Sequence, residues 1–275
     1  MDKQKAAELE KVAHNIRVNA LKAIHAAGSG HPGGSFSIAE ILAVLYFDEM
    51  NISPENAKDK DRDKFVLSKG HAVPALYAVL AEKGFFAPED MMSLRKIGSD
   101  FQGHPNMNMV PGIEMSTGSL GQGFSAAVGM ATAGKIDGAK GRIYTITGDG
   151  ELQEGIIWEA ALSAAHRKLD NIVAIIDRNG LQIDGETDLV KKVMPIAEKF
   201  EAFGWNVISI DGHSLSEIKD ALDKARACKG KPTAIVAKTH KGQGVSFMTD
   251  VAGWHGKAPN DEQFEQAMAE LGGDN

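Results

Sequence analysis

The sequence predicts an α/β fold, with a doubly wound, mainly parallel sheet flanked by helices. Apolar runs of strand length at 142–147 and 171–176 enclose a segment of helical character at 151–168. Strands that alternate with helices in this way favour a parallel sheet, because each return to the same edge needs a crossover. Asp149 follows the first run and Asn179 follows the second, so polar side chains are expected at the carboxyl edge, where open sheets bind ligands.

The remaining segments predict a single domain over residues 1–275 with an amphipathic helix at 3–27 and a helical tail at 260–275. Ser37 and Glu40 have the spacing of a capping box, which predicts a helix that ends near Met50. A loop at 98–119 is long enough to predict a functional role. We expect further helices at 72–83, 122–135, 195–203, 214–228 and 260–272, a short one from Pro88, and strands at 65–68, 205–210 and 233–238.

Composition excludes several classes of function. Hydrophobic residues make up 43% of the chain and charged residues 24%, as in an ordinary globular protein. The net charge of −7 argues against nucleic acid or an anionic membrane as the main partner. A single cysteine allows no disulfide framework, and no segment approaches the length of a membrane span. We therefore expect a cytoplasmic protein.

Asp149, Gly150 and Asn179 offer the chemistry of a metal–diphosphate site. Carboxylate and amide oxygens suit a small divalent cation, and the Gly150 amide can approach an anion. Taken alone, Gly-Asp-Gly is more typical of a surface turn. However, Asn179 follows Gly150 after 28 intervening residues. This spacing resembles the thiamine-diphosphate-binding motif, although Asp177-Arg178-Asn179 matches only the second of its two usual asparagines.

Histidines in loops form a second group of candidates. His31, His71, His104, His240 and His255 all stand in loops, four of them beside glycine. Most loop histidines are solvated surface groups, but imidazole can also bind sugar hydroxyls or phosphate and relay protons near neutral pH. A zinc site is the rival interpretation, which no His-x₃-His pair, cysteine cluster or His-Glu-x-x-His motif supports.

Six motifs in order resemble those of transketolase, over about residues 10 to 260. 1-Deoxyxylulose-5-phosphate synthase is a weaker match, because its loops differ around the second and third histidines. Dihydroxyacetone synthase is a closer relative than this synthase. The motifs are Ser-Gly-His-Pro-Gly at 29–33, Phe-Val-Leu-Ser-Lys-Gly-His at 65–71, Gly-His-Pro-Asn at 103–106, Thr-Gly-Ser-Leu-Gly-Gln-Gly at 117–123, Gly-Asp-Gly-Glu-Leu-Gln-Glu-Gly at 148–155 and Trp-His-Gly at 254–256.

The resemblance implies roles for the histidines. His71 and His255 would contact the cofactor diphosphate and the reacting centre, and His31 and His255 would reach the sugar. His104 would bind the donor hydroxyls and assist proton transfer. His240 matches no motif of the family, and no role is assigned to it.

For the cofactor, the resemblance implies thiamine diphosphate held by Mg²⁺, with Ca²⁺ or Mn²⁺ as substitutes. Asp149, Asn179 and the Leu181 carbonyl would bind the metal. Glu154 would lie at the dimer interface and hydrogen-bond the partner's cofactor-activating glutamate; without the resemblance, a first-turn glutamate favoured by the helix dipole is the preferred interpretation. The Gly150 amide would bind the diphosphate, and Leu120 would pack near the cofactor ring beside the backbone of Gly118 and Gly121.

Transketolases are more than twice as long as this chain. The resemblance therefore implies the N-terminal, diphosphate-binding subunit of a split transketolase, with the polar residues 271–275 as a natural terminus. It would transfer a two-carbon ketol unit between sugar phosphates in the pentose phosphate pathway, together with a C-terminal subunit in an α₂β₂ heterotetramer. Alternatives are half of a dihydroxyacetone synthase or 2-oxoacid dehydrogenase, a non-catalytic regulatory subunit, and a truncated longer protein.

Overall fold

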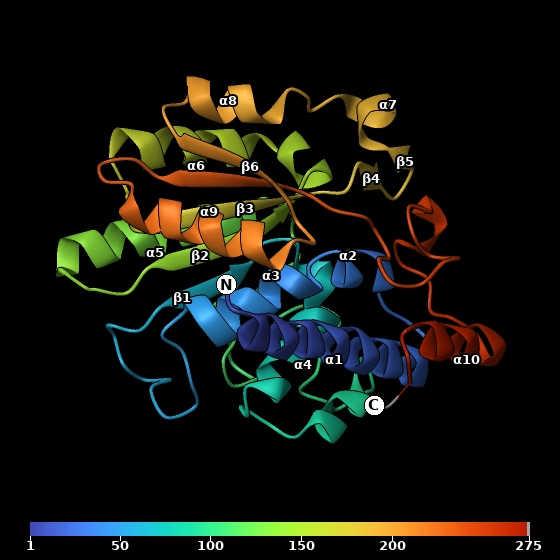
Figure 1. The fold of residues 1–275 in the computed structure, drawn as a ribbon. Helices are drawn as coiled ribbons and strands as arrows, with labels where there is room; N and C mark the ends of the chain where they lie inside the picture. The colour runs from blue at the N-terminus through green and yellow to red at the C-terminus, as the bar shows by residue number, and fades with distance from the viewer. Residues whose placement is uncertain (274–275) are drawn as a thin grey trace.

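A five-stranded parallel sheet forms the centre of the computed structural model, which describes residues 1–273; the last two residues of the expected tail lie outside it (Figure 1). The doubly wound α/β fold is thereby confirmed. All neighbouring strands of the sheet run parallel. In spatial order the strands are β1 (Lys64–Leu67), β2 (Ile143–Gly148), β3 (Ile172–Arg178), β7 (Thr233–Lys238) and β6 (Asn206–Asp211).

Helices cover both faces of the sheet because the strands are apolar on both faces. In β2, Tyr144 and Ile146 pack into one core cluster while Ile143 packs into another, as the two-residue period of a strand requires. One face is covered by α5 (Gln122–Asp137), α6 (Gly155–His166) and α8 (Ile196–Ala202). The opposite face is covered by α1 (Lys3–Ala27), α3 (Ala39–Val44), α4 (Val73–Glu82) and α9 (Leu215–Ala227).

The strand order explains why α9 lies on the other face from α6 and α8. The chain passes from β3 to β6 and then returns to place β7 between them. A right-handed crossover in the reverse direction puts its helix on the opposite face. A third, smaller cluster packs α2 (Pro32–Phe36) and α10 (Asp261–Glu270) against α1, with Phe36 and Ala267 fully buried.

The helix expected after Ser37 forms, but the capping box predicted for it does not. The helix begins at Ala39 with Ile38 at the cap, and no side chain caps it. Ser37 instead donates to the buried Asp177 at 2.8 Å, and Glu40 accepts from Arg17 at 2.6 Å. Both side chains thus bond to distant parts of the chain rather than to the nearby helix terminus.

Several short elements lie where loops or longer helices were expected. The expected helix at 151–168 is divided into a 3₁₀ turn, Gly150–Gln153, and α6. The polar turn after β3 contains a small hairpin of β4 (Leu181–Gln182) and β5 (Gly185–Glu186), followed by α7 (Thr187–Lys191). Further 3₁₀ turns span Gly70–Ala72, Pro88–Ser93 and Ala252–Trp254, whereas residues 98–119 contain neither helix nor strand, as expected.

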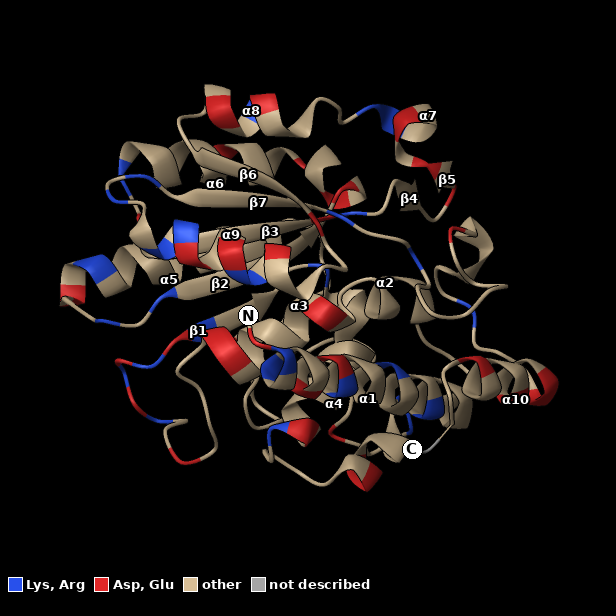
Figure 2. Ribbon diagram, viewed as in Figure 1, with Lys and Arg blue, Asp and Glu red and all other residues tan. Residues whose placement is uncertain are grey.

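Charged residues are interspersed over the outer helices and loops (Figure 2). On the strands they stand at the ends, and Asp177, Arg178, Asp211 and Lys238 are all at carboxyl ends. In residues 1–273, no helix has both the length and the apolar character that crossing a membrane requires. The carboxyl edge of the sheet is therefore the polar end of an otherwise apolar layer.

Glu40 links three separate segments. Its carboxylate accepts hydrogen bonds from Arg17 of α1 and from His213, which precedes α9, at 2.6 and 3.0 Å. Burial alone would raise the pKa of Glu40, but the hydrogen bond from His213 and the charge of Arg17 outweigh it and lower the pKa to about 2. The folded state thus favours the ionised carboxylate.

We expect Glu40 to make the protein acid-sensitive. The unfolded chain takes up a proton near the ordinary pKa of glutamate, whereas the folded chain does not until about pH 2. The free energy of unfolding should therefore fall by about 1 kcal/mol between pH 5 and pH 3.5 because of this group alone. Urea unfolding of the wild type and Glu40→Gln measures the effect, and identical pH slopes for both would contradict it.

Candidate active site

A cavity of about 330 Å³ opens at the carboxyl edge of the sheet and brings most of the predicted site residues together. Its walls come from the ends of β1, β2 and β3 and from four loops. The predicted residues that line it are His31, His71, His104, Gly118, Leu120, Asp149, Gly150, Glu154, Asn179, Leu181 and His255.

Four histidines from four segments converge in this cavity. The ring centre of His31 is 5.2 Å from that of His71, 5.4 Å from His255 and 6.4 Å from His104. The rings of His71 and His255 stack at 4.9 Å. Because these residues are up to 224 positions apart in the chain, only the tertiary fold makes them one group.

The four imidazoles are held in the neutral form. Burial is the largest cause in each case, and it lowers the pKa of His31 to about 4 and that of His255 to about 3. The pKa values of His71 and His104 are also lowered, by burial and then by the charges of Lys69 and Arg95 respectively. Neutral imidazole both donates and accepts a hydrogen bond, so these rings can bind hydroxyls and move protons near neutral pH.

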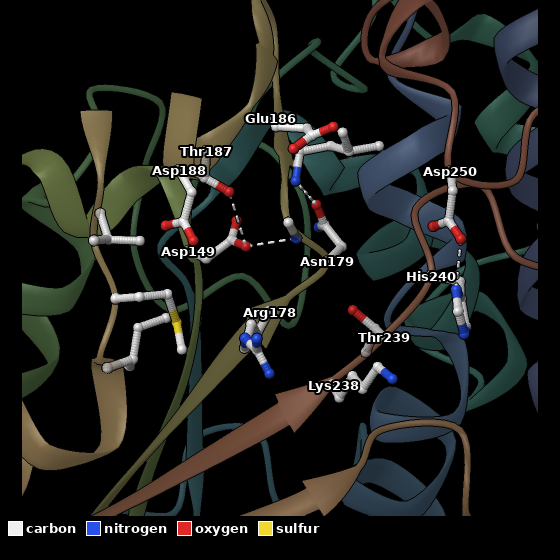
Figure 3. A pocket seen from close by; sticks show the side chains of 15 residues that line it. Asp149, Arg178, Asn179, Glu186, Thr187, Asp188, Lys238, Thr239, His240 and Asp250 are labelled. Atoms are coloured by element: carbon white, nitrogen blue, oxygen red, sulfur yellow. Dashed lines mark hydrogen bonds and ion pairs between the residues drawn. The ribbon is translucent and has the colours of Figure 1, made fainter. Parts of the chain in front are cut away.

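Asp149 joins the ends of β2 and β3. Its two carboxylate oxygens accept from the amides of Gly150 and Gly180 at 2.8 and 2.6 Å. Figure 3 shows the carboxylate facing the segment that carries Asn179, as the predicted metal site requires. Burial and then the charge of Asp177 raise the pKa of Asp149 to about 6, against the effect of the two backbone hydrogen bonds.

Asn179 and Leu181 complete a set of three hard oxygens. The Asn179 amide group donates to Asp177 at 2.9 Å, which turns its oxygen the other way, toward the Leu181 amide at 3.1 Å. The described residues contain no group of three or more His, Cys, Asp or Glu that could hold a metal ion. One carboxylate and two neutral oxygens fit Mg²⁺ shared with a diphosphate, because Mg²⁺ is commonly held by one or two carboxylates plus phosphate oxygens.

A buried ion pair behind Asn179 had no predicted role. Lys69 donates to Asp177 at 2.6 Å and to the Gly34 carbonyl at 2.7 Å, and both charged side chains are almost fully buried. Asp177 also accepts from Ser37, Asn179 and Thr239. Its pKa is lowered, because the charge and hydrogen bond of Lys69 outweigh burial. In the sequence, only the polar residues at the end of this apolar strand indicated such a pair.

Glu151 is a second buried carboxylate without a predicted role. It accepts from Ser68, Thr147 and the Gly148 amide at 2.5, 2.6 and 3.1 Å. It also accepts from the Gly121 amide at 2.8 Å. Gly121 does not line the cavity; a Cβ there would lie 2.5 Å from Ile156, so this glycine permits close packing of α5 and α6.

Lys241 is the fourth residue without a predicted role. It follows β7, and its ammonium group donates to the Leu181 carbonyl at 2.8 Å and to His255 Nδ1 at 3.0 Å. Burial, followed by the charge of Lys69, lowers its pKa to about 8. A cation in this position can bind a diphosphate. Lys241 follows β7, which is the neighbour of β3 and the third strand after β2 and β3 to end at this edge of the sheet. This position in the sequence could have indicated its role.

A neighbouring cavity of about 420 Å³ shares Asp149, Asn179 and Leu181 with the first (Figure 3). His240 lies there and pairs with Asp250 at 2.7 Å, apart from the histidine cluster. Glu154 is exposed at the start of α6 and makes no capping hydrogen bond. The proposed dimer contact of Glu154 stays a prediction.

Comparison with known proteins decides the family. The family model described as "Transketolase, thiamine diphosphate binding domain" matches residues 9–275. The chain belongs to the transketolase family. This confirms the family predicted from the six ordered motifs, and it makes the chain the N-terminal, cofactor-binding part of a transketolase, an enzyme of the transferase class.

Transketolase relatives fall into two length classes. The chain is 48% identical to the 6-deoxy-6-sulfo-D-fructose transketolase subunit SqwG of Clostridium sp. (strain MSTE9), covering 96% of each. It is 43% identical to one of the subunits of the apulose-4-phosphate transketolase of Phocaeicola vulgatus, covering 96% of this chain and 93% of that one. It spans only 43% of the full-length mammalian transketolases that it matches.

A solved transketolase has the same fold. The crystal structure of transketolase from Campylobacter jejuni superimposes with a TM-score of 0.92 at 35% identity, over 100% of this chain and 44% of that one. This chain therefore corresponds to less than half of the length of that enzyme.

Loss of the buried lysine should destabilise the fold far more than loss of an exposed one. Lys69→Met leaves Asp177 charged, buried and without its cation, which should lower the free energy of unfolding by about 3–5 kcal/mol. Lys135 pairs with Asp170 at the surface, so Lys135→Met should cost less than about 1 kcal/mol. Urea unfolding followed by circular dichroism compares the two, and equal losses would show that the buried pair does not stabilise the sheet edge.

Proposed function

We propose that this transketolase chain transfers a two-carbon ketol unit from a ketose phosphate to an aldose phosphate, with thiamine diphosphate and Mg²⁺, in complex with a C-terminal subunit. The observation that carries this proposal is the position of Asp149 and Asn179. They meet at the sheet edge in the same cavity as four neutral histidines.

The residues of the cavity fit the cofactor's diphosphate and its metal. Asp149, Asn179 and the Leu181 carbonyl would hold Mg²⁺, and the Gly150 amide would exchange its hydrogen bond to Asp149 for one to a phosphate oxygen. Lys241 adds a buried positive charge beside the same carbonyl. Bound thiamine diphosphate would supply the electron sink that allows a carbon–carbon bond beside a carbonyl to break and form.

The histidines would act on the sugar. Lys241 can only donate, so His255 Nδ1 accepts and its neutral ring carries the proton on Nε2. His31 and His104 would bind the hydroxyls of the donor ketose. Because all four rings are uncharged near neutral pH, each can pass a proton without first losing one to solvent.

The partner is proposed from the two subunit relatives. Both are named as subunits, and this chain covers nearly their whole length. The groups that a full-length transketolase carries beyond this region would come from a second chain. We further propose an α₂β₂ assembly with Glu154 at the contact between cofactor-binding subunits, a cytoplasmic location and a role in the pentose phosphate pathway.

The purified chain should have negligible transfer activity, because it contains less than half of the full-length enzyme. Adding the C-terminal subunit from the same organism, with thiamine diphosphate and Mg²⁺, should restore activity. A coupled assay with xylulose 5-phosphate and ribose 5-phosphate measures the transfer, and 6-deoxy-6-sulfofructose and apulose 4-phosphate test other donors. Full activity of the chain alone, or turnover of pyruvate but of no ketose phosphate, would contradict the proposal.

Asp149→Ala should abolish metal-dependent cofactor binding, because it removes the charged ligand of the proposed site. We expect the affinity of the assembled enzyme for thiamine diphosphate in Mg²⁺ to fall more than about 100-fold, since even residues outside the first ligand shell are typically worth 10- to 100-fold. Calorimetric titration measures it. Asp188→Ala is the matched control, because this exposed carboxylate lines the neighbouring cavity without serving the proposed site. Unchanged affinity in Asp149→Ala would refute the metal assignment.

A further inference from the structure

Arg95 has an unusual backbone conformation next to the histidine cluster. Its φ is 58°, which L-residues other than glycine rarely adopt. Its amide donates to the Phe101 carbonyl at 2.9 Å, which closes the loop between these two residues. A residue held in this conformation needs support from its surroundings, and such residues often mark functional sites.

The support comes from the side chain, which bridges two loops. The guanidinium donates to Ser29 Oγ at 3.4 Å and to His31 Nδ1 at 3.3 Å in one loop. It reaches the Gly103 carbonyl at 3.5 Å in the other loop. Each of these loops carries a histidine of the cavity, His31 in the first and His104 in the second.

Gly103 provides the space for this bridge. A Cβ at this position would lie 2.5 Å from Arg95 Cζ, closer than any side chain allows. The long loop at 98–119 therefore passes directly against the guanidinium, one residue before His104. Within residues 1–273, no carboxylate forms an ion pair with Arg95. The guanidinium is thus used for the two histidine loops and not for a salt bridge.

We infer that Arg95 is a positioning residue for ketol transfer, which clamps the His31 and His104 loops together and holds His31 with Nδ1 as acceptor and the proton on Nε2. The assignment follows because arginine can only donate a hydrogen bond. The role in transfer rests on the proposed function, whereas the clamp itself rests on the contacts alone.

The charge of Arg95 supports the same state of His31. After burial, Arg95 is the largest cause that lowers the pKa of His31, followed by His104 and Lys241. It also lowers the pKa of His104. The ring centres of His71 and His255 lie 5.2 and 5.4 Å from that of His31. Neutral His31 is therefore surrounded by groups that oppose a second proton.

The kinetic test compares Arg95→Met, Arg95→Lys and the control Lys96→Met in the assembled enzyme. Lys96 is the exposed neighbour, so its variant should behave as wild type. Arg95→Met should lower kcat/KM for the ketose donor by about 100-fold, because a small displacement of a reacting group has this effect. Affinity for thiamine diphosphate should change less than twofold, since Arg95 does not line the cavity.

Arg95→Lys distinguishes geometry from charge. Lysine keeps the charge but lacks the planar fork that spans two loops, so it should recover less than a tenth of the lost activity. Full recovery by lysine, or wild-type kinetics in Arg95→Met, would overturn the clamp. Gly103→Ala should resemble Arg95→Met, and the double variant should be no worse than either single variant.

A spectroscopic test needs no catalytic activity. In the full chain labelled with ¹⁵N-histidine, the His31 ring should show Nδ1 unprotonated and Nε2 protonated at pH 7. In Arg95→Met, the pKa of His31 should rise and the two nitrogens should exchange the proton. An unchanged His31 in this variant would overturn the inference. If the assembled wild type transfers no ketol unit, the proposed function fails while this measurement still decides the clamp.

Discussion

The buried pair of Lys69 and Asp177 is the interaction on which the sheet edge depends. Asp177 is the next-to-last residue of β3, and the groups that bond to it come from the segment before α3, from the end of β1 and from the residue after β7. The same carboxylate orients the amide of Asn179. A charge of this kind in an apolar layer is stable only when fully paired, so the pair fixes the relative positions of the segments that form the cavity.

Positive charge also sets the chemistry of the cavity. Lys69, Lys241 and Arg95 lie around the four imidazoles of the cavity, and each of these cations disfavours protonation of at least one ring. The cavity thereby combines cations suited to an anionic cofactor with uncharged groups suited to sugar hydroxyls. Burial alone would lower the histidine pKa values, but it would not create this division between cationic and neutral groups.

The sequence predicts the scaffold well because apolar periodicity is a local property. All five strands of the parallel sheet and the main helices appear within a few residues of their expected positions, and Asp149 and Asn179 meet as strand-end residues should. Lys69, Asp177, Glu151 and Lys241 escaped prediction because a buried polar residue has no periodic pattern. Lys69 and Asp177 are 108 positions apart, and nothing local connects them. The capping box predicted at Ser37 failed for the same reason: a serine side chain can bond locally or across the fold, and the local sequence does not show which.

The position of β7 has a consequence for how the protein is made. This strand is the last of the sheet in the chain, yet it lies between β3 and β6. Until a ribosome has synthesised residues 233–238, both neighbours expose an unpaired edge, and an exposed edge invites pairing with other chains. The nascent chain therefore carries both open β edges between the synthesis of β6 and that of β7, and the insertion that closes them also delivers Lys241 to the cavity.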